Sequence, residues 1–144
     1  MREILFRGKR KTNNTWAYGG YIKDIAENEI HIGDTRLFST IYPETFGQYT
    51  GLKDKNGTKI FEGDIIRMHY FFQNYDPSTL GAFEDEVNIV GVVKCELLDG
   101  FYVETLDDHS IGYLQWVQEP SEELEILGNI YDNPELVKER SNEQ

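Results

Sequence analysis

Short apolar runs separated by tight-turn residues dominate this sequence, and the pattern predicts a series of antiparallel β-strands. Asn56-Gly57 lies between two strand-prone segments, and both residues adopt the positive φ of a hairpin turn at low cost. Residues 87–96 form the most strand-prone run, because Val and Ile recur along them. We therefore expect a mainly β fold, a small barrel or sandwich of short antiparallel strands with one or two short helices.

Three regions are predicted along the chain. Residues 1–46 form an N-terminal β lobe and residues 47–137 a barrel-like β lobe. Within the second lobe, residues 73–86 combine Asn, Asp, Pro, Ser and Gly with three consecutive acids, which favours a long surface loop. The charged tail at 138–144 is expected to fray. Helix is scarce, and the best candidates are Ile111–Gln118 and Glu135–Glu139.

Charge is unevenly distributed. The chain carries 14 basic and 26 acidic side chains, a formal net charge of −12. Residues 1–11 hold five basic residues against one acidic residue, a local charge of +4, which leaves −16 for the rest. A charge so negative repels nucleic-acid phosphates, so nucleic acid is not the expected partner of the whole surface. Plain solubility and mimicry of DNA's charge toward a basic host protein both remain open.

Cysteine content and hydropathy predict a cytoplasmic protein. Cys95 is the one cysteine and cannot form an internal disulfide, which favours a reducing compartment. No apolar run approaches membrane-spanning length, and the start of the sequence does not resemble a signal peptide. We expect no association with a membrane.

Local patterns for metal binding are absent from the sequence. His31, His69 and His109 are far apart, and none forms a spaced pair typical of zinc ligands. The acids of residues 84–86 could hold Mg²⁺ for a metal-dependent hydrolase, but a solvated acidic loop is favoured. We therefore predict no metal-binding and no cofactor-binding residues.

Nucleophilic catalysis is also not expected. Residues 107–110 contain all three residue types of a hydrolase triad. Neighbours on a strand point to opposite faces, so these residues cannot relay a proton in line, and a polar turn explains them better. We predict no catalytic residues. A site assembled from distant segments remains open.

Four sequence blocks resemble the YopX family, small proteins encoded by bacteriophages and prophages. They are residues 2–9 followed by Trp16, residues 47–57, residues 60–66 and residues 128–136, and they occur in order across nearly the whole chain. The resemblance implies a predominantly β protein that acts in the cytoplasm of a bacterium. It implies no biochemical activity and supplies no catalytic residues.

A run of aromatic residues gives the leading functional hypothesis. Tyr70, Phe71, Phe72 and Tyr75 lie close together, and consecutive aromatics on a strand cannot all face inward, so some are exposed or lie at an interface. With the resemblance and the acidic charge, this predicts a non-enzymatic phage accessory protein. It would bind a host or phage protein through these aromatics and form a homo-oligomer.

A basic hairpin gives the alternative hypothesis, a nucleic-acid-binding β-barrel. Its candidate contacts are Arg7, Lys9, Arg10, Lys11 and Trp16, which place basic charge beside a stacking ring. The charge of −16 on the rest of the chain opposes this hypothesis. A solvated turn beside a buried tryptophan is favoured instead.

Overall fold

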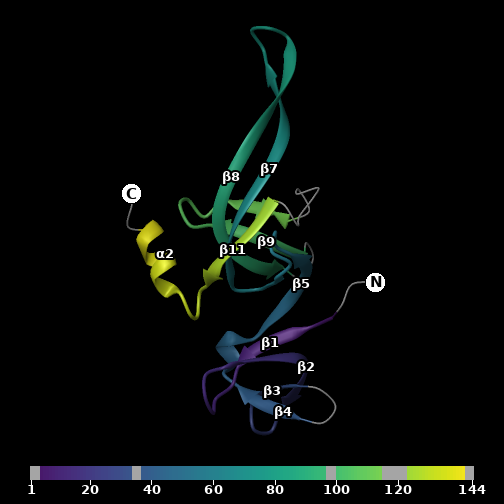
Figure 1. The fold of residues 1–144 in the computed structure, drawn as a ribbon, viewed down its shortest axis with the longest axis vertical. Coiled ribbons are helices and arrows are strands. Elements are labelled where there is room, and N and C mark those ends of the chain that lie inside the picture. Colours follow the sequence, from purple (N-terminus) through teal and green to yellow (C-terminus); the bar gives the residue numbers. More distant parts are fainter. Residues whose placement is uncertain (1–3, 34–36, 97–99, 115–122, 142–144) are drawn as a thin grey trace.

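Eleven strands in two antiparallel sheets make up most of the described chain (Figure 1). The structure is a computed structural model, and it describes residues 4–33, 37–96, 100–114 and 123–141. The first sheet has the order β4-β3-β2-β1-β5-β6 and the second has the order β10-β9-β8-β7-β11. The predicted mainly β, sandwich-like fold of antiparallel strands is confirmed, although the sheets do not close into a barrel.

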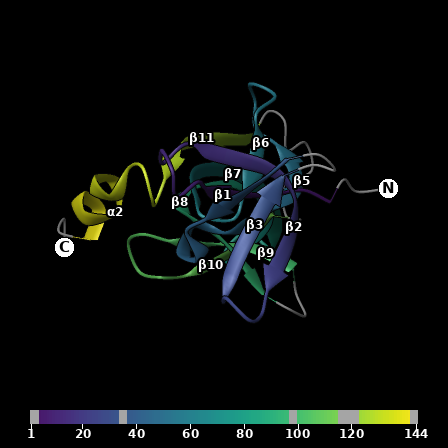
Figure 2. The same cartoon turned by 90° about the horizontal axis from the view of Figure 1, so that it is seen from below.

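The bounds of the elements follow the turns of the sequence closely. The first sheet contains β1 (Phe6–Lys9), β2 (Trp16–Asp24), β3 (Glu29–Gly33), β4 (Phe38–Ile41), β5 (Gly47–Lys53) and β6 (Lys59–Phe61), with the 3-10 helix η1 (Pro43–Thr45) between β4 and β5. The second sheet contains β7 (Asp64–Asp76), β8 (Gly81–Glu96), β9 (Gly100–Thr105), β10 (Ile111–Tyr113) and β11 (Leu124–Asn129). The helix α2 (Pro134–Ser141) follows β11 and lies to one side of the sheets (Figure 2).

Each sheet has its own hydrophobic core. The first is small and is built on Ala17, Ile32 and Ile41. The second is larger and draws on β6 through β11, and its buried members are Ile60, Ile66, Met68, Val93, Phe101, Val103, Leu114 and Leu124. Each fully buried aliphatic side chain contributes about 1.5–3 kcal/mol. Because Ile60 belongs to the first sheet by pairing and to the second by packing, β6 joins the two sheets.

The hairpin predicted at Asn56-Gly57 is present between β5 and β6. Gly57 has a φ of +83°. One oxygen of the Asp54 carboxylate accepts the backbone N–H groups of Asn56 and Thr58, each at 2.9 Å. The local turn residues therefore determine this connection, as expected from the sequence.

A second turn, between β6 and β7, sends the chain from the first sheet into the second. Gly63 has a φ of +94°, and the Asp64 carboxylate accepts the backbone N–H of Phe61 at 2.8 Å. A Cβ at position 63 would lie 2.8 Å from the ring of Tyr131, so a side chain there would displace that ring as well as strain the backbone. Local turn residues therefore determine this connection as well.

The prediction of a long surface loop at residues 73–86 is wrong. These residues belong to β7 and β8, which pair continuously out to Asp76 opposite Gly81. Only residues 77–80 form a turn, in which the Asp76 carboxylate accepts both the N–H and the hydroxyl of Ser78. The turn-rich composition correctly marks the tip of a hairpin. The long backbone ladder on either side was missed because polar and aromatic residues do not alternate regularly there.

The outcome for the two helix predictions differs. Glu135–Glu139 lies inside α2, and α2 continues to Ser141, into the segment expected to fray. The other prediction is wrong at its start, because Ile111–Tyr113 is β10, a strand paired with β9. Pairing at the sheet edge overrides the weak local helix preference there. Residues 115–118 of that prediction lie outside the described residues.

Candidate functional site

The two-stranded ribbon Tyr70–Val87, called the arm below, projects well beyond the body of the protein (Figure 1). β11 pairs with β7 from Asp64 to Met68, and β9 pairs with β8 from Gly91 onward. Within the described strands, the arm therefore has no third strand beside it. Nearly all of its surface faces outward.

The predicted aromatic interface lies on the arm, and strand geometry divides its residues between two environments. Tyr70 is partly buried and packs against the larger core. Phe71 and Tyr75 are 49% and 56% exposed. The side chain of Phe72 lies outside the described part of the structure, although its backbone is in β7. The expectation that the consecutive aromatics cannot all face inward agrees with this arrangement.

Two further apolar residues on the arm were not singled out from the sequence. Leu80 lies in the turn with 78% of its surface exposed, and Phe83 on β8 is 46% exposed. The sequence does not single them out because the composition of residues 73–86 favours a loop. The signal that could have found them is the turn sequence Asp76-Pro77-Ser78 with aromatic residues on both sides.

The arm is also acidic. Its charged side chains are Asp76, Glu84, Asp85 and Glu86, and no Lys or Arg lies between Arg67 and Lys94. In the pairing register, Glu86 lies opposite Phe71 and Glu84 lies opposite Gln73. Phe71, Tyr75, Glu84 and Glu86 therefore share one face of the arm, whereas Phe83, Asp76 and Asp85 belong to the other. The two faces together carry a formal charge of −4.

His69 links the base of the arm to the body. Its Nδ1 atom contacts the Glu123 carboxylate, its Nε2 atom lies 3.2 Å from Glu86 on β8, and its ring meets the ring of Phe71 edge-on at 4.7 Å. The hydrogen bond to Glu123, followed by that to Glu86, raises the pKa of His69 above its usual 6.5. Protonation of His69 would therefore strengthen the contacts that hold the arm.

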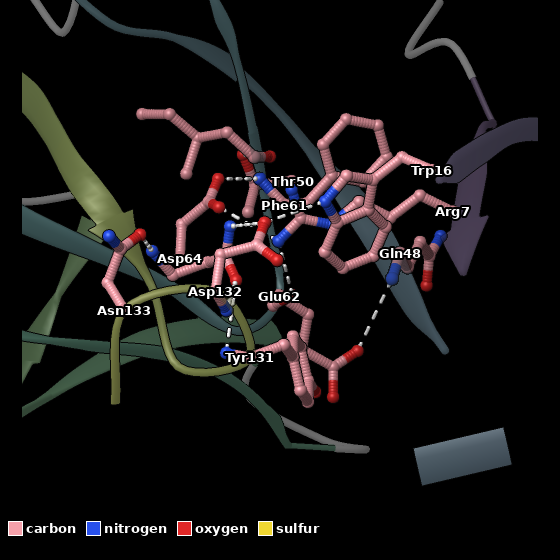
Figure 3. A network of polar contacts seen from close by, with 12 residues as sticks. Arg7, Trp16, Gln48, Thr50, Phe61, Glu62, Asp64, Tyr131, Asp132 and Asn133 are labelled. Atoms are coloured by element: carbon pink, nitrogen blue, oxygen red, sulfur yellow. Dashed lines mark hydrogen bonds and ion pairs between the residues drawn. The ribbon is translucent and has the colours of Figure 1, made fainter. Parts of the chain in front are cut away.

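A second polar cluster lies where the two sheets meet (Figure 3). The Arg7 guanidinium on β1 donates to the Asp64 carboxylate at 2.8 Å, and both side chains are almost fully buried. The guanidinium carbon lies 4.3 Å from the Trp16 ring centre and 4.9 Å from that of Phe61. Burial raises the pKa of Asp64, and the charge of Arg7 opposes that rise.

Two further basic residues of the predicted nucleic-acid contact, Lys9 and Arg10, are engaged within the chain. Lys9 forms an ion pair with Asp132, and the Trp16 indole N–H donates to the same carboxylate at 2.9 Å. Burial disfavours the charged form of Asp132, but hydrogen bonds from Lys9, Trp16 and Asn129 outweigh burial and lower its pKa to about 2. The hairpin of β1 and β2 is thereby attached to the turn before α2.

Arg10 and Lys11 complete the basic hairpin. Arg10 donates to the Ser39 hydroxyl at 3.1 Å, to the Thr15 hydroxyl at 2.9 Å and to the Trp16 carbonyl at 2.8 Å. Lys11 is exposed. The structure thus uses most of this basic cluster to organise the first sheet and its contact with the second.

The comparison with protein families concerns almost the whole chain. A family model described as YopX protein matches residues 5–138, which include both the arm and the cluster around Arg7. The chain belongs to the YopX family. A comparison with curated proteins found no match.

A solved structure is similar to this YopX-family chain in fold. It is the crystal structure of protein EF1440 from Enterococcus faecalis, with 20% sequence identity and a TM-score of 0.51. The similarity covers 95% of this chain and 99% of that one. It supports the two-sheet fold.

Metal-ligating groups of the YopX-family chain are dispersed in the structure. Glu84, Asp85 and Glu86 follow one another on β8, so their side chains alternate between the two faces of the arm. No three His, Cys, Asp or Glu side chains among the described residues are grouped to hold a metal ion.

In the same residues, no helix is long and apolar enough to cross a membrane.

Proposed function

We propose that the chain is a non-enzymatic phage or prophage accessory protein that binds a protein partner through the arm, in the bacterial cytoplasm. The observation that carries this proposal is the surface of the arm. The arm exposes the rings of Phe71, Tyr75 and Phe83 near carboxylates. No third strand among the described residues pairs with this ribbon.

The apolar residues of the arm are of the type that anchors protein interfaces. A buried aromatic side chain removes about 150–250 Å² from water, and a standard interface covers about 800 Å² on each partner. Phe71 and Tyr75 lie on one face of the arm and Phe83 on the other, and each ring is about half exposed. Phe71 and Tyr75 are therefore suited to anchor the centre of an interface on their face, next to the exposed Leu80 of the turn. Exposed large rings also have an energetic cost in water, which a partner would relieve.

Charge complementarity indicates the chemistry of the partner. The arm carries four carboxylates and no Lys or Arg, so it favours a basic protein surface. Lys and Arg side chains of such a partner would pair with Glu84 and Glu86 and lie over the rings of Phe71 and Tyr75. Association of two arms would bring two charges of −4 together. We therefore favour a different protein over a second copy as the partner.

The nucleic-acid alternative is weaker. Its basic residues Arg7, Lys9 and Arg10 are engaged with Asp64, Asp132 and the first sheet. A phosphate backbone would have to compete with these intramolecular bonds. Binding of single-stranded or duplex DNA at low salt would revive this alternative.

Affinity capture from a bacterial lysate tests the proposal if three baits are compared. They are the unchanged chain, the double variant Phe71→Ser/Tyr75→Ser, and the control Ile25→Ser, which changes an 86% exposed residue after β2. The proposal predicts a basic protein recovered by the first and third baits and lost with the second. Equal recovery by all three baits would contradict it. If the purified unchanged chain, with no other protein present, has a molar mass above that of one chain, the arm would be taken as a self-association surface instead.

A further inference from the structure

A pocket of about 650 Å³ opens where the two sheets meet, beside the cluster around Arg7. Its size falls within the range of about 300–1,000 Å³ typical of small-molecule sites. Its apolar wall includes the rings of Trp16, Tyr18 and Phe61, and its polar groups include Arg7, Lys59 and Asp64. A few polar groups among aromatic walls are the usual composition of a ligand site.

Arg7 has hydrogen-bonding capacity that the described residues do not fill. The side chain is buried, and its Nη2 atom donates to Asp64 and to the Glu62 carbonyl. Its Nε–H has no acceptor among the residues that the structure describes. A buried donor of this kind is nearly always satisfied in proteins, so an acceptor at this point is expected.

The rings of the pocket offer flat surfaces for stacking. Tyr18 is 52% exposed, and its ring centre lies 5.5 Å from that of Phe61. Trp16 also lines the pocket, and its ring centre lies 4.3 Å from the guanidinium carbon of Arg7. The pocket therefore places planar aromatic surface directly beside a guanidinium.

The charge of the pocket differs from that of the rest of the molecule. Arg7 and Lys59 contribute two positive charges to the lining, against the one carboxylate of Asp64. That carboxylate already accepts hydrogen bonds from Arg7 and from the Phe61 N–H. In a chain with a net charge of −12, this is a local site suited to an anion.

We propose that the pocket binds a small ligand that combines a planar aromatic ring with an anionic oxygen group. The ring stacks on Tyr18 and Trp16, and the anionic oxygen accepts hydrogen bonds from Arg7 and Lys59. A nucleoside monophosphate and an aromatic carboxylate both have this chemistry. The site is separate from the arm and does not depend on the protein-binding role proposed above.

Calorimetric titration of the full chain tests the pocket. The probes are the four common nucleoside monophosphates and indole-3-acetate, with inorganic phosphate and uncharged nucleosides as the partial ligands. The proposal predicts that at least one aromatic anion binds with a dissociation constant of about 1 mM or lower. The partial ligands should bind at least about tenfold more weakly, because each lacks one of the two contacts. The probe that binds shows whether the natural ligand is a nucleotide or an aromatic carboxylate.

Matched variants locate the binding. Tyr18→Leu and Lys59→Gln change partly exposed side chains outside the buried ion pair, so the chain should still fold, which thermal unfolding would verify. Each should weaken binding at least about tenfold, whereas Tyr75→Ser on the arm should leave it unchanged. No binding by any aromatic anion would overturn the proposal, and so would binding that Tyr18→Leu does not weaken.

Discussion

Arg7 on β1 and Asp64 at the start of β7 form a buried ion pair across the junction of the two sheets, with Nη2 and Oδ1 2.8 Å apart. The pair lies under Trp16 and Phe61, away from water. Its position makes it a direct link between the sheet that carries the small core and the sheet that carries the arm. The junction therefore depends on charge as well as on apolar packing.

Arg7→Ala should destabilise the chain by about 3–5 kcal/mol, because it leaves the Asp64 carboxylate buried without its partner. Urea unfolding of the purified proteins measures this change. The matched control is Arg67→Ala, which removes an ion pair with Glu125 at a half-exposed position and should cost about 1 kcal/mol or less. Equal losses for the two variants would contradict the role assigned to Arg7.

The effect of Arg7→Ala should also depend on pH. Burial raises the pKa of Asp64, and removing Arg7 takes away the charge that opposes this rise. A folded-state pKa above the unfolded value means that protonation favours the folded state, so the penalty in the variant shrinks as pH falls through the raised pKa. Unfolding free energies measured from neutral to acidic pH should show the two proteins converging. A constant gap would show that Asp64 does not carry the penalty.

Gly63→Ala should destabilise the chain more than Gly57→Ala. Both glycines have positive φ, +94° and +83°, so each substitution costs about 1–2 kcal/mol in backbone conformation. At position 63 the new Cβ would also lie 2.8 Å from the Tyr131 ring, whereas at position 57 nothing lies within 4 Å. Overpacking adds about 1–3 kcal/mol to the first variant. Thermal or urea unfolding measures the loss of stability in both variants. A larger loss of stability for Gly57→Ala than for Gly63→Ala would contradict the prediction.

The connections that could be predicted from the sequence are the local ones. The turns at Gly57 and Gly63 depend on residues adjacent in the chain, so their chemistry is visible in the sequence. The pairing of Arg7 with Asp64 joins residues 57 positions apart, and neither residue alone indicates its partner. The run of aromatics that includes the exposed Phe71 and Tyr75 could be recognised in the sequence. Its place on a projecting ribbon could not, because it depends on pairing with β8, whose residues 81–86 have a composition typical of loops.

His69→Gln should remove a pH-dependent contribution to stability at the base of the arm. Hydrogen bonds to Glu123 and then Glu86 raise the folded-state pKa of His69 above 6.5. The contribution of the charged imidazole is therefore complete below the unfolded pKa of about 6.5 and is lost as pH rises through the folded pKa. The stability difference between the unchanged chain and the variant should shrink from pH 6 to pH 9. Glu123→Gln should show a similar loss, and a difference that stays constant with pH would contradict the assignment.

Substitutions on the arm should separate the exposed aromatics from those that support the fold. Tyr75→Ser should change the free energy of unfolding by about 0.5 kcal/mol or less, because the side chain is 56% exposed. Phe71→Ser should cost about 0.5–1.5 kcal/mol, because it also removes the edge-on contact with the His69 ring. Tyr70→Ser should cost about 1–3 kcal/mol, because Tyr70 packs against the larger core. Urea unfolding measures all three. Equal losses at the three positions would mean that the arm is not an outward-facing surface.

Site-specific photo-crosslinking tests the proposed protein-binding role of the arm most directly. A photoreactive phenylalanine analogue replaces Tyr75 in one variant and Ile25 in another, and both are irradiated in living bacteria. The proposal predicts that the position 75 variant forms a covalent adduct with a basic protein, and that adding Glu84→Gln and Glu86→Gln weakens the adduct. The position 25 variant should not form it. Absence of any adduct at position 75, or the same adducts from both positions, would contradict the proposal.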